Sequence, residues 1–204
     1  MKMSPYFQIK NQTKTFESLI QHLSGFTANI RITIYPDMCV MDAVNESHTS
    51  LTKISLTKDW FNEYEVDTQF SVIVNTTILY KIVHVLDVNF PIKVLLSTCD
   101  LVVEGKSLHS DVTYTIPSLT IDIPTIDVPE NIDYAADISM NSKTFCNILD
   151  HLLIIGDTCS ISIKEDSMIF VSDGDYGSTK INLTIDELNS YAVEENIDLQ
   201  LSYH

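Results

Sequence analysis

The sequence predicts an α+β fold built from repeated units, in which helices pack on one face of antiparallel sheets. The first observation is composition: hydrophobic residues make up 45% of the 204 residues and charged residues 20%, a mixture that forms folded domains. The second is a repeat with an offset of 129 residues, in which a helical pattern is followed by strand-like alternation. The third is a proline-bearing stretch between the two copies, which divides the chain.

Each copy of the repeat begins with a helix. Residues 16–23 (FESLIQHL) and 145–152 (FCNILDHL) carry apolar residues at i, i+3, i+4 and i+7. This is the spacing of a helix with one buried stripe. Phe16 and Phe145 begin the two stripes, so we expect both side chains to be buried.

Strands follow each helix in the same order. Apolar residues alternate at 30–34 and at 161–163, which indicates half-buried strands. A turn that contains Asp comes next in each copy, at 35–37 and 164–166. The copies also share an apolar strand, at 38–41 in the first copy and 168–171 in the second. A matching segment follows, TKISL (52–56) in the first copy and TKINL (179–183) in the second.

The first copy continues with a strand, a helix and three more strands. Alternation at 70–74 indicates the strand, and Asn75 can cap the helix that follows. The buried face of this helix is expected to consist of aliphatic residues, namely Ile78, Leu79, Ile82, Val83 and Leu86. Further strands are expected at 92–97, 100–104 and 109–116, with a turn at Glu104-Gly105 between the last two.

A connector separates the copies. Residues 116–130 (IPSLTIDIPTIDVPE) hold three of the six prolines, which favours an extended segment that is poor as an interior strand. Its apolar residues need a protein surface to cover them, so the connector is expected to lie across a sheet. The expected organisation is a first domain at 1–116, a connector at 117–134 and a second domain at 135–204. The second copy is shorter by about 45 residues in this alignment, so we expect a fragment whose second unit is incomplete.

Charge excludes several classes of protein. The chain has 12 Lys and Arg against 28 Asp and Glu, for a net charge of −16. This argues against a broadly basic nucleic-acid binder and against adsorption to an anionic membrane.

No apolar run reaches the roughly 18 residues of a membrane span, and the N-terminus lacks the apolar segment of a signal peptide. The four scattered cysteines are expected to be buried, reduced thiols of an intracellular protein.

Motifs of enzyme active sites are absent from the sequence. There is no glycine-rich phosphate loop, HExxH, GxSxG or Cys/His cluster, and the six histidines show no metal-ligand spacing. Residues 173–177 (DGDYG) loosely resemble a calcium loop without its closing Glu, so a plain turn between strands is expected. We therefore expect no catalytic residues, no metal and no cofactor.

Four segments, in order along the chain, carry a resemblance to a known family. They are Met41-Asp42 followed by Ser47–Leu51, Ile126–Glu130 followed by Tyr134, Phe145 through Ile155-Gly156-Asp157, and Ser172–Leu183. In the same order, they resemble four segments of the sliding clamp family of the proliferating cell nuclear antigen type. These are the Met-Asp-Ser-x-His-x-x-Leu segment, the end of the interdomain connector, the first helix of the second domain, and the loop and strand after that helix.

The resemblance implies a DNA clamp fold and a role as a DNA polymerase processivity factor. In this family three subunits close head to tail into a homotrimer ring, which encircles duplex DNA independently of its sequence and performs no chemistry. Strands 109–116 and 177–184 would pair between subunits. Implied partners are a clamp loader, DNA polymerase and other replication or repair proteins with PIP-box-like peptides. The implied location is the nucleus, or a cytoplasmic replication site for a viral relative.

Site residues follow from the resemblance by position. The partner-peptide pocket would be lined by Met41, His48, Thr49, Leu51, Ile126, Val128 and Pro129. Ordinary core packing is the alternative for the apolar members of this set. The DNA-facing positions would be Lys14, Gln21, Lys81, His84, Lys143 and Asn147. Lys164 falls where some family members accept ubiquitin, and an exposed turn lysine is the alternative there.

The charge of the DNA-facing helices departs from the family pattern, which is rich in Lys and Arg. Three lysines fall on or beside these helices, and Asp150 would repel DNA. This weak charge favours a second hypothesis, a clamp-fold scaffold in transcription or checkpoint assembly that has lost DNA sliding. A third hypothesis, an unrelated enzyme with a coincidental repeat, has no motif to support it.

Overall fold

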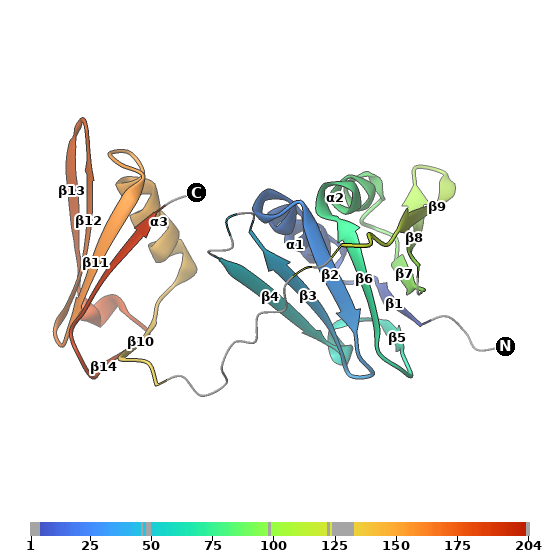
Figure 1. Ribbon diagram of the computed structural model, residues 1–204, viewed down its shortest axis with the longest axis horizontal. Coiled ribbons are helices and arrows are strands. Elements are labelled where there is room, and N and C mark those ends of the chain that lie inside the picture. The colour runs from blue at the N-terminus through green and yellow to red at the C-terminus, as the bar shows by residue number, and fades with distance from the viewer. Residues whose placement is uncertain are drawn as a thin grey trace. The chain divides into compact units, whose positions relative to one another are not determined.

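The chain forms two compact units, Met1–Asp127 and Val128–His204. A computed structural model describes residues 5–45, 47, 50–97, 99–121, 123 and 133–202, with the side chain of Glu187 excepted. Within these residues no helix has the length and apolar character needed to cross a membrane. The strand pairs are antiparallel and the helices lie against the sheets, so the α+β fold is confirmed (Figure 1).

The described residues of unit 1 form two antiparallel sheets and two α-helices. The sheet orders are β5-β1-β7-β8-β9 and β4-β3-β2-β6. The strands are β1 (Tyr6–Ile9), β2 (Asn29–Ile34), β3 (Met38–Val44), β4 (Leu51–Thr57), β5 (Glu63–Glu65), β6 (Phe70–Asn75), β7 (Ile92–Leu96), β8 (Asp100–Ser107) and β9 (Ser110–Pro117). The helices are α1 (Thr13–Phe26), α2 (Thr76–Val85) and a 3-10 turn, η1 (Lys58–Trp60).

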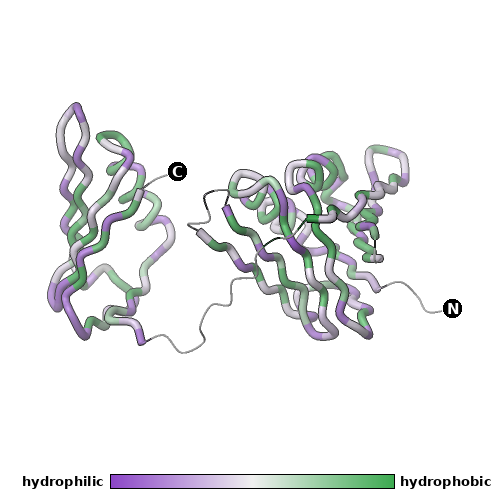
Figure 2. Tube along the Cα trace, viewed as in Figure 1, coloured by the Kyte–Doolittle hydropathy of each residue, from purple (hydrophilic) through white to green (hydrophobic). Residues whose placement is uncertain are grey.

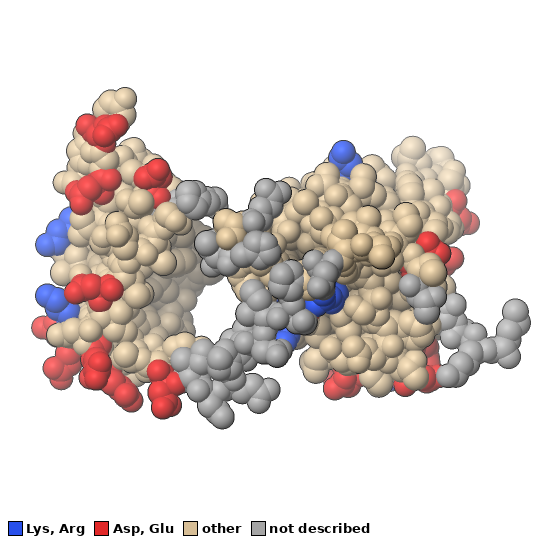
Figure 3. Space-filling view, in the orientation of Figure 1, with Lys and Arg blue, Asp and Glu red and all other residues tan. Residues whose placement is uncertain are grey.

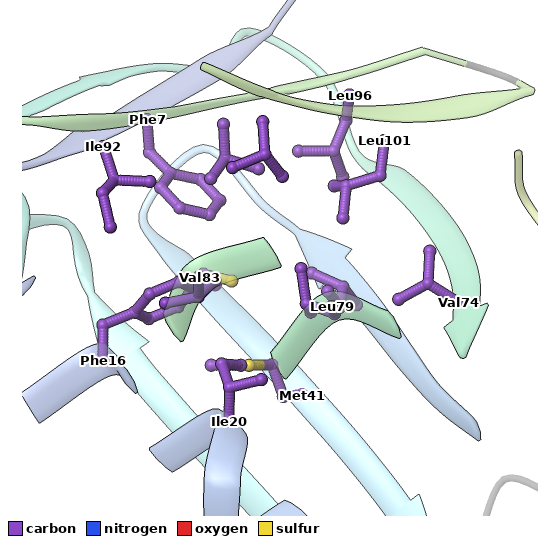
Figure 4. Close-up of a cluster of buried hydrophobic side chains, with 14 of the residues drawn as sticks. Phe7, Phe16, Ile20, Met41, Val74, Leu79, Val83, Ile92, Leu96 and Leu101 are labelled. Atoms are coloured by element: carbon purple, nitrogen blue, oxygen red, sulfur yellow. The ribbon is translucent and has the colours of Figure 1, made fainter. Parts of the chain in front are cut away.

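The core of unit 1 lies between the helices and the sheets. Figure 4 shows Phe16 and Ile20 of α1 pointing toward the same interior as Leu79 of α2 and Met41 of β3. Hydropathy alternates along many of the strands, with green and purple segments succeeding each other (Figure 2). The period-two patterns in the sequence therefore correspond to sheets with one face turned to this core.

The helix α2 confirms most of its predicted buried face. The Asn75 side chain accepts a hydrogen bond from the Ile78 amide at 2.9 Å, as an N-cap should. The prediction was wrong for Ile78, whose side chain is 46% exposed. At 100° per residue, the buried stripe centres on Leu79, Val83 and Leu86, so Ile78 lies at its edge.

The hairpin between β8 and β9 turns later than expected. Ser107 pairs with Ser110, so the turn residues are Leu108 and His109 rather than Glu104-Gly105. Gly105 lies inside β8, where an added Cβ would come within 2.9 Å of Leu86 Cδ1. The glycine makes room for Leu86 instead of forming the turn.

Unit 2 repeats the first half of unit 1. Its sheet order is β13-β12-β11-β15, with a separate pair β10-β14. Its elements are β10 (Ala136–Ser139), α3 (Ser142–Leu152), β11 (Thr158–Lys164), β12 (Ser167–Gly174), β13 (Gly177–Leu183), η2 (Ile185–Glu187), β14 (Ser190–Val193) and β15 (Ile197–Ser202). Residues 173–177 form the hairpin between β12 and β13, as expected.

A tyrosine closes the same turn in both units. Tyr64 Oη lies 2.6 Å from the carbonyl oxygens of Tyr35 and Met38, which flank the turn between β2 and β3. Tyr191 donates to the carbonyls of Lys164 and Ser167 at the turn between β11 and β12. Burial raises the pKa of Tyr64, so its hydroxyl remains a donor at neutral pH. This shared contact supports the internal repeat.

The buried stripe of α3 is narrower than predicted. Phe145 is 38% exposed, whereas its counterpart Phe16 is 2% exposed. In unit 1, α2 packs beside α1, but α3 is the one α-helix among the described residues of unit 2. One flank of α3 therefore has no neighbouring helix among those residues, which leaves Phe145 exposed.

The cysteines divide into two classes. Cys39 and Cys159 are buried as expected, but Cys99 and Cys146 are exposed, so the prediction was wrong for those two. Cys99 follows the end of β7, and Cys146 lies on the outer side of α3, where neither is covered.

We expect a thiol-reactive reagent such as DTNB to modify two thiols rapidly in the folded protein. Burial raises the pKa of Cys39 to about 12, so its reactive thiolate is scarce at neutral pH. Mass mapping should place the fast label on Cys99 and Cys146. Cys99→Ser/Cys146→Ser should abolish the fast phase, and rapid labelling of Cys39 without denaturant would contradict this burial.

Candidate functional site

The α-helices in the described part of the chain are nearly free of acidic residues. Together α1, α2 and α3 contain three of the 12 Lys and Arg but two of the 28 Asp and Glu. The acidic side chains lie elsewhere, and Figure 3 shows several on the visible face of unit 2. The net negative charge therefore does not extend to the helices.

All six predicted DNA-facing residues are exposed on helices. Lys14 and Gln21 lie on α1, Lys81 and His84 on α2, and Lys143 and Asn147 on α3. Because α1 and α2 pack against each other, the four residues of unit 1 lie on neighbouring helices. Asp150 is exposed on α3, where its negative charge cancels the positive charge of Lys143.

One contact on the helices was not predicted. His84 Nδ1 lies 2.7 Å from Glu17 Oε1, which ties α2 to α1. His84 also has a ring contact with Tyr80, with centroids 5.4 Å apart. Glu17 lies on the predicted helix, but sequence spacing could not reveal a partner 67 residues away.

The two strands expected to pair between subunits both lie at sheet edges. β9 is the last strand of its five-stranded sheet, and β13 is the first of its four-stranded sheet. No described strand pairs with their outer sides. Such edges carry backbone groups that can accept another strand.

Both edge strands turn apolar side chains to one face. Val112 and Tyr114 of β9 pack against the core of unit 1, and Ile116 is buried in it. On β13, Ile181 packs against the core of unit 2 and Leu183 is buried in it. The alternate residues of both strands are exposed.

The outer face of the β4-β3-β2-β6 sheet, opposite the helices, carries one of the predicted pocket residues. Leu51 begins β4 and pairs with Val44 of β3. Val44 and Val40 are buried, although neither belongs to the core beneath the helices. Neither valine was predicted to line the pocket. Both face the same side of the sheet as Leu51, so the alternation of side chains along β3 could have identified them.

Met41 does not lie on that outer face. It is 1% exposed and belongs to the core, because it pairs with Ile32 and shares the helix-covered face with it. The prediction that Met41 lines a surface pocket is therefore corrected. The other predicted pocket residues, namely His48, Thr49, Ile126, Val128 and Pro129, lie outside the described residues.

Lys164 is the last residue of β11 and is exposed at the turn before β12. Its backbone carbonyl accepts the Tyr191 hydroxyl, which leaves the ammonium group out of that contact. Among the described residues no group of three or more His, Cys, Asp or Glu is arranged to hold a metal ion.

Comparison with known proteins gives a consistent result for both units. A family model described as "Proliferating cell nuclear antigen, N-terminal domain" matches residues 9–102. A second, "Proliferating cell nuclear antigen, C-terminal domain", matches residues 127–202. The two matches follow the division into two units.

Two full-length relatives are similar over most of the chain. "DNA polymerase sliding clamp 1" of Sulfolobus acidocaldarius is 26% identical over 173 residues, which are 83% of this chain and 68% of that protein. "Proliferating cell nuclear antigen" of Chaetomium thermophilum is 27% identical over 167 residues, which are 79% of this chain and 63% of that protein. The chain thus spans about two thirds of the length of these relatives.

The opposite faces assigned to Met41 and Leu51 predict different effects on stability. We expect Met41→Ala to lower the free energy of unfolding of unit 1 by about 2–5 kcal/mol, because it leaves a cavity in the core. Leu51→Ala should cost clearly less, because its side chain is half-buried at a strand end. Urea unfolding followed by the fluorescence of Trp60, the single tryptophan, measures both. Equal losses would contradict the assignment.

Proposed function

Because this chain belongs to the proliferating cell nuclear antigen family of sliding clamps, we propose that it acts as a DNA polymerase processivity factor. In this role it would form part of a ring around duplex DNA and dock replication and repair proteins without catalysing a reaction. Holding a polymerase beside its template raises the effective concentration of the enzyme at the primer end. The observation that carries the proposal is the pair of free edge strands, β9 and β13, in a chain matched by both domain models.

Ring closure would use these edges. Antiparallel pairing of β9 with β13 of another copy continues both sheets, provided that the core-facing residues of both strands fall on the same side. A register that matches apolar residues and overlaps most of both strands places Val112 opposite Leu183 and Tyr114 opposite Ile181. In this register Thr115 and Lys180 face each other on the exposed side. A head-to-tail contact of this kind closes into a ring, and three copies are the expected number.

The helices are the proposed DNA-facing surface. Lys14, Lys81 and Lys143 supply charge, and Gln21 and Asn147 can donate to phosphates without reading sequence. His84, whose ring lies 2.7 Å from Glu17, completes the set. The near absence of acids on these helices supports this assignment in a chain of net charge −16.

Partner peptides are proposed to dock on the outer face of the β4-β3-β2-β6 sheet. Val40, Val44 and Leu51 provide apolar surface there, with the predicted residues His48, Thr49, Ile126, Val128 and Pro129 as further lining. The proposed occupant is a PIP-box-like peptide with an apolar plug.

A clamp loader and DNA polymerase are the proposed protein partners, and the nucleus or a viral replication site is the proposed location. Modification of Lys164 also remains a proposal.

The second candidate function is a clamp-fold scaffold that no longer slides on DNA. The observation that favours it is the low charge of the helices, above all Asp150 on α3. The scaffold would keep peptide docking but would have lost DNA sliding, so it would not depend on Lys14 and Lys81. The two functions therefore separate in the second experiment below.

We expect charge at position 115 to control self-association. Thr115→Lys places like charges opposite each other at Lys180, whereas Thr115→Glu places opposite charges there, with each pair changing association by about 0.2–1 kcal/mol. Sedimentation velocity should show weaker assembly for Thr115→Lys and equal or stronger assembly for Thr115→Glu. Thr115→Lys/Lys180→Glu should restore it. If Thr115→Lys and Thr115→Glu behave alike, the register is wrong; if the wild type never self-associates, ring closure fails.

We expect Lys14→Ala/Lys81→Ala to weaken binding to duplex DNA. Each lysine that neutralises a phosphate contributes about 0.9 to the slope of log K against log salt, so the slope should become shallower. Lys10→Ala/Lys58→Ala removes the same charge from exposed positions outside the α-helices and should have a smaller effect. Equal effects of the two double variants would argue for the scaffold function, as would an absence of duplex binding by an assembled ring.

A further inference from the structure

The described residues that follow β9 are fixed to the other sheet at two points, the edge of β6 and the outer face of β2. At the first point, the Ser118 amide donates to the Cys99 carbonyl at 2.6 Å. The Leu119 amide donates to the Ile73 carbonyl at 2.7 Å, and Ser118 Oγ accepts from the Ile73 amide at 3.1 Å. Ser118 and Leu119 thus join β6 of one sheet to Cys99, in the turn between β7 and β8 of the other.

The second point is Arg31 on β2. Its Nη2 donates to the backbone carbonyl of Ile123, and the Ile123 side chain is 7% exposed. Arg31 pairs with Ile73 on one side and with Asp42 on the other. Neighbouring positions on the sheet therefore hold Leu119 and Ile123, four residues apart in the chain.

We propose that Arg31 is a positioning residue for the docking of partner peptides. This inference rests on the proposed function, and it adds a residue to which neither the sequence nor the resemblance assigns a role. Arg31 holds the chain at Ile123, immediately before the segment with the predicted lining residues Ile126, Val128 and Pro129. It thereby fixes Ile123, the last described residue before that segment, to β2.

The position of Arg31 on the sheet suits this role. Its register partner Asp42 lies between Val40 and Val44 on the outer face of β3, so Arg31 is diagonal to both valines. A guanidinium group carries several donors in a fixed planar arrangement and can hold a carbonyl while it makes other contacts. A carbonyl anchored by a charged donor also forms a stronger hydrogen bond than one with a neutral donor.

The test compares Arg31→Met, Arg31→Lys and Lys53→Met with the wild type. Lys53 is exposed on β4 and pairs with Asp42, so Lys53→Met removes the same charge from the same face without touching residues 118–123. The probe is a fluorescent peptide in which one aliphatic and two aromatic residues form the plug, with affinity measured by anisotropy. Hydrogen exchange of amides 119–123 is measured without peptide, and thermal unfolding checks that each variant folds.

We expect Arg31→Met to raise the peptide Kd by roughly tenfold, as the loss of one charge-assisted hydrogen bond would, and to speed exchange at residues 119–123. Arg31→Lys keeps the charge and a donor, so it should recover part of both effects. Lys53→Met should leave both near wild type. Unchanged exchange in Arg31→Met, or the same loss of affinity in Lys53→Met, would overturn the positioning role.

The two possible failures can be distinguished. If the wild type binds no such peptide, docking on this face fails, and the positioning role fails with it. Hydrogen exchange then still reports whether Arg31 anchors Ile123. If the wild type binds but Arg31→Met binds equally well, the proposed docking function survives and the role of Arg31 is wrong.

Discussion

The alternation of side chains along β-strands is the constraint on which the rest of this structure depends. In β3, Met41 faces the helices while Val40 and Asp42 face outward, and a shift of one residue would exchange the two sets. Pairing of Met41 with Ile32 fixes this register against the core. The same alternation turns Tyr114 and Ile116 of β9 and Ile181 and Leu183 of β13 inward and leaves the alternate residues exposed. The core-facing and the outward-facing side chains of these strands are therefore set by one periodicity.

The sequence was sufficient where the evidence lay within one element or in the repeat. It predicted the helices that begin near Phe16 and Phe145 and the order of strands after them, because apolar spacing is a local property. It failed where a distant neighbour decides the outcome. Gly105 is required by the packing of Leu86, and the exposure of Phe145 reflects the absence of a neighbouring described helix. Spacing within a segment contains neither fact.

The candidate sites show the same division. The six positions predicted to face DNA are all exposed on helices, although Lys14 and Lys143 precede the segments in which the apolar spacing predicted helix. Met41 was misassigned because a motif match specifies which residue is present but not which face of a strand it occupies. Val40 and Val44 could have been predicted to face the side of the sheet opposite Ile30, Ile32 and Ile34, because side chains alternate between the two faces along each strand. The contacts of Arg31 with Ile123 and of His84 with Glu17 span 92 and 67 residues, and no sequence pattern records them.

The strand β9 connects the proposed functions. Its outer edge is the surface offered to another copy, and its last residue, Pro117, leads directly to Ser118. Ser118 and Leu119 then bind the edge of β6, and Arg31 holds Ile123 farther along. Self-association and peptide docking would thus depend on opposite ends of one short stretch of chain. Because β9 pairs with β8 and the residues after it are held by the β6 backbone and by Arg31, substitutions on the exposed face of β9 can change assembly while the anchored segment keeps its place.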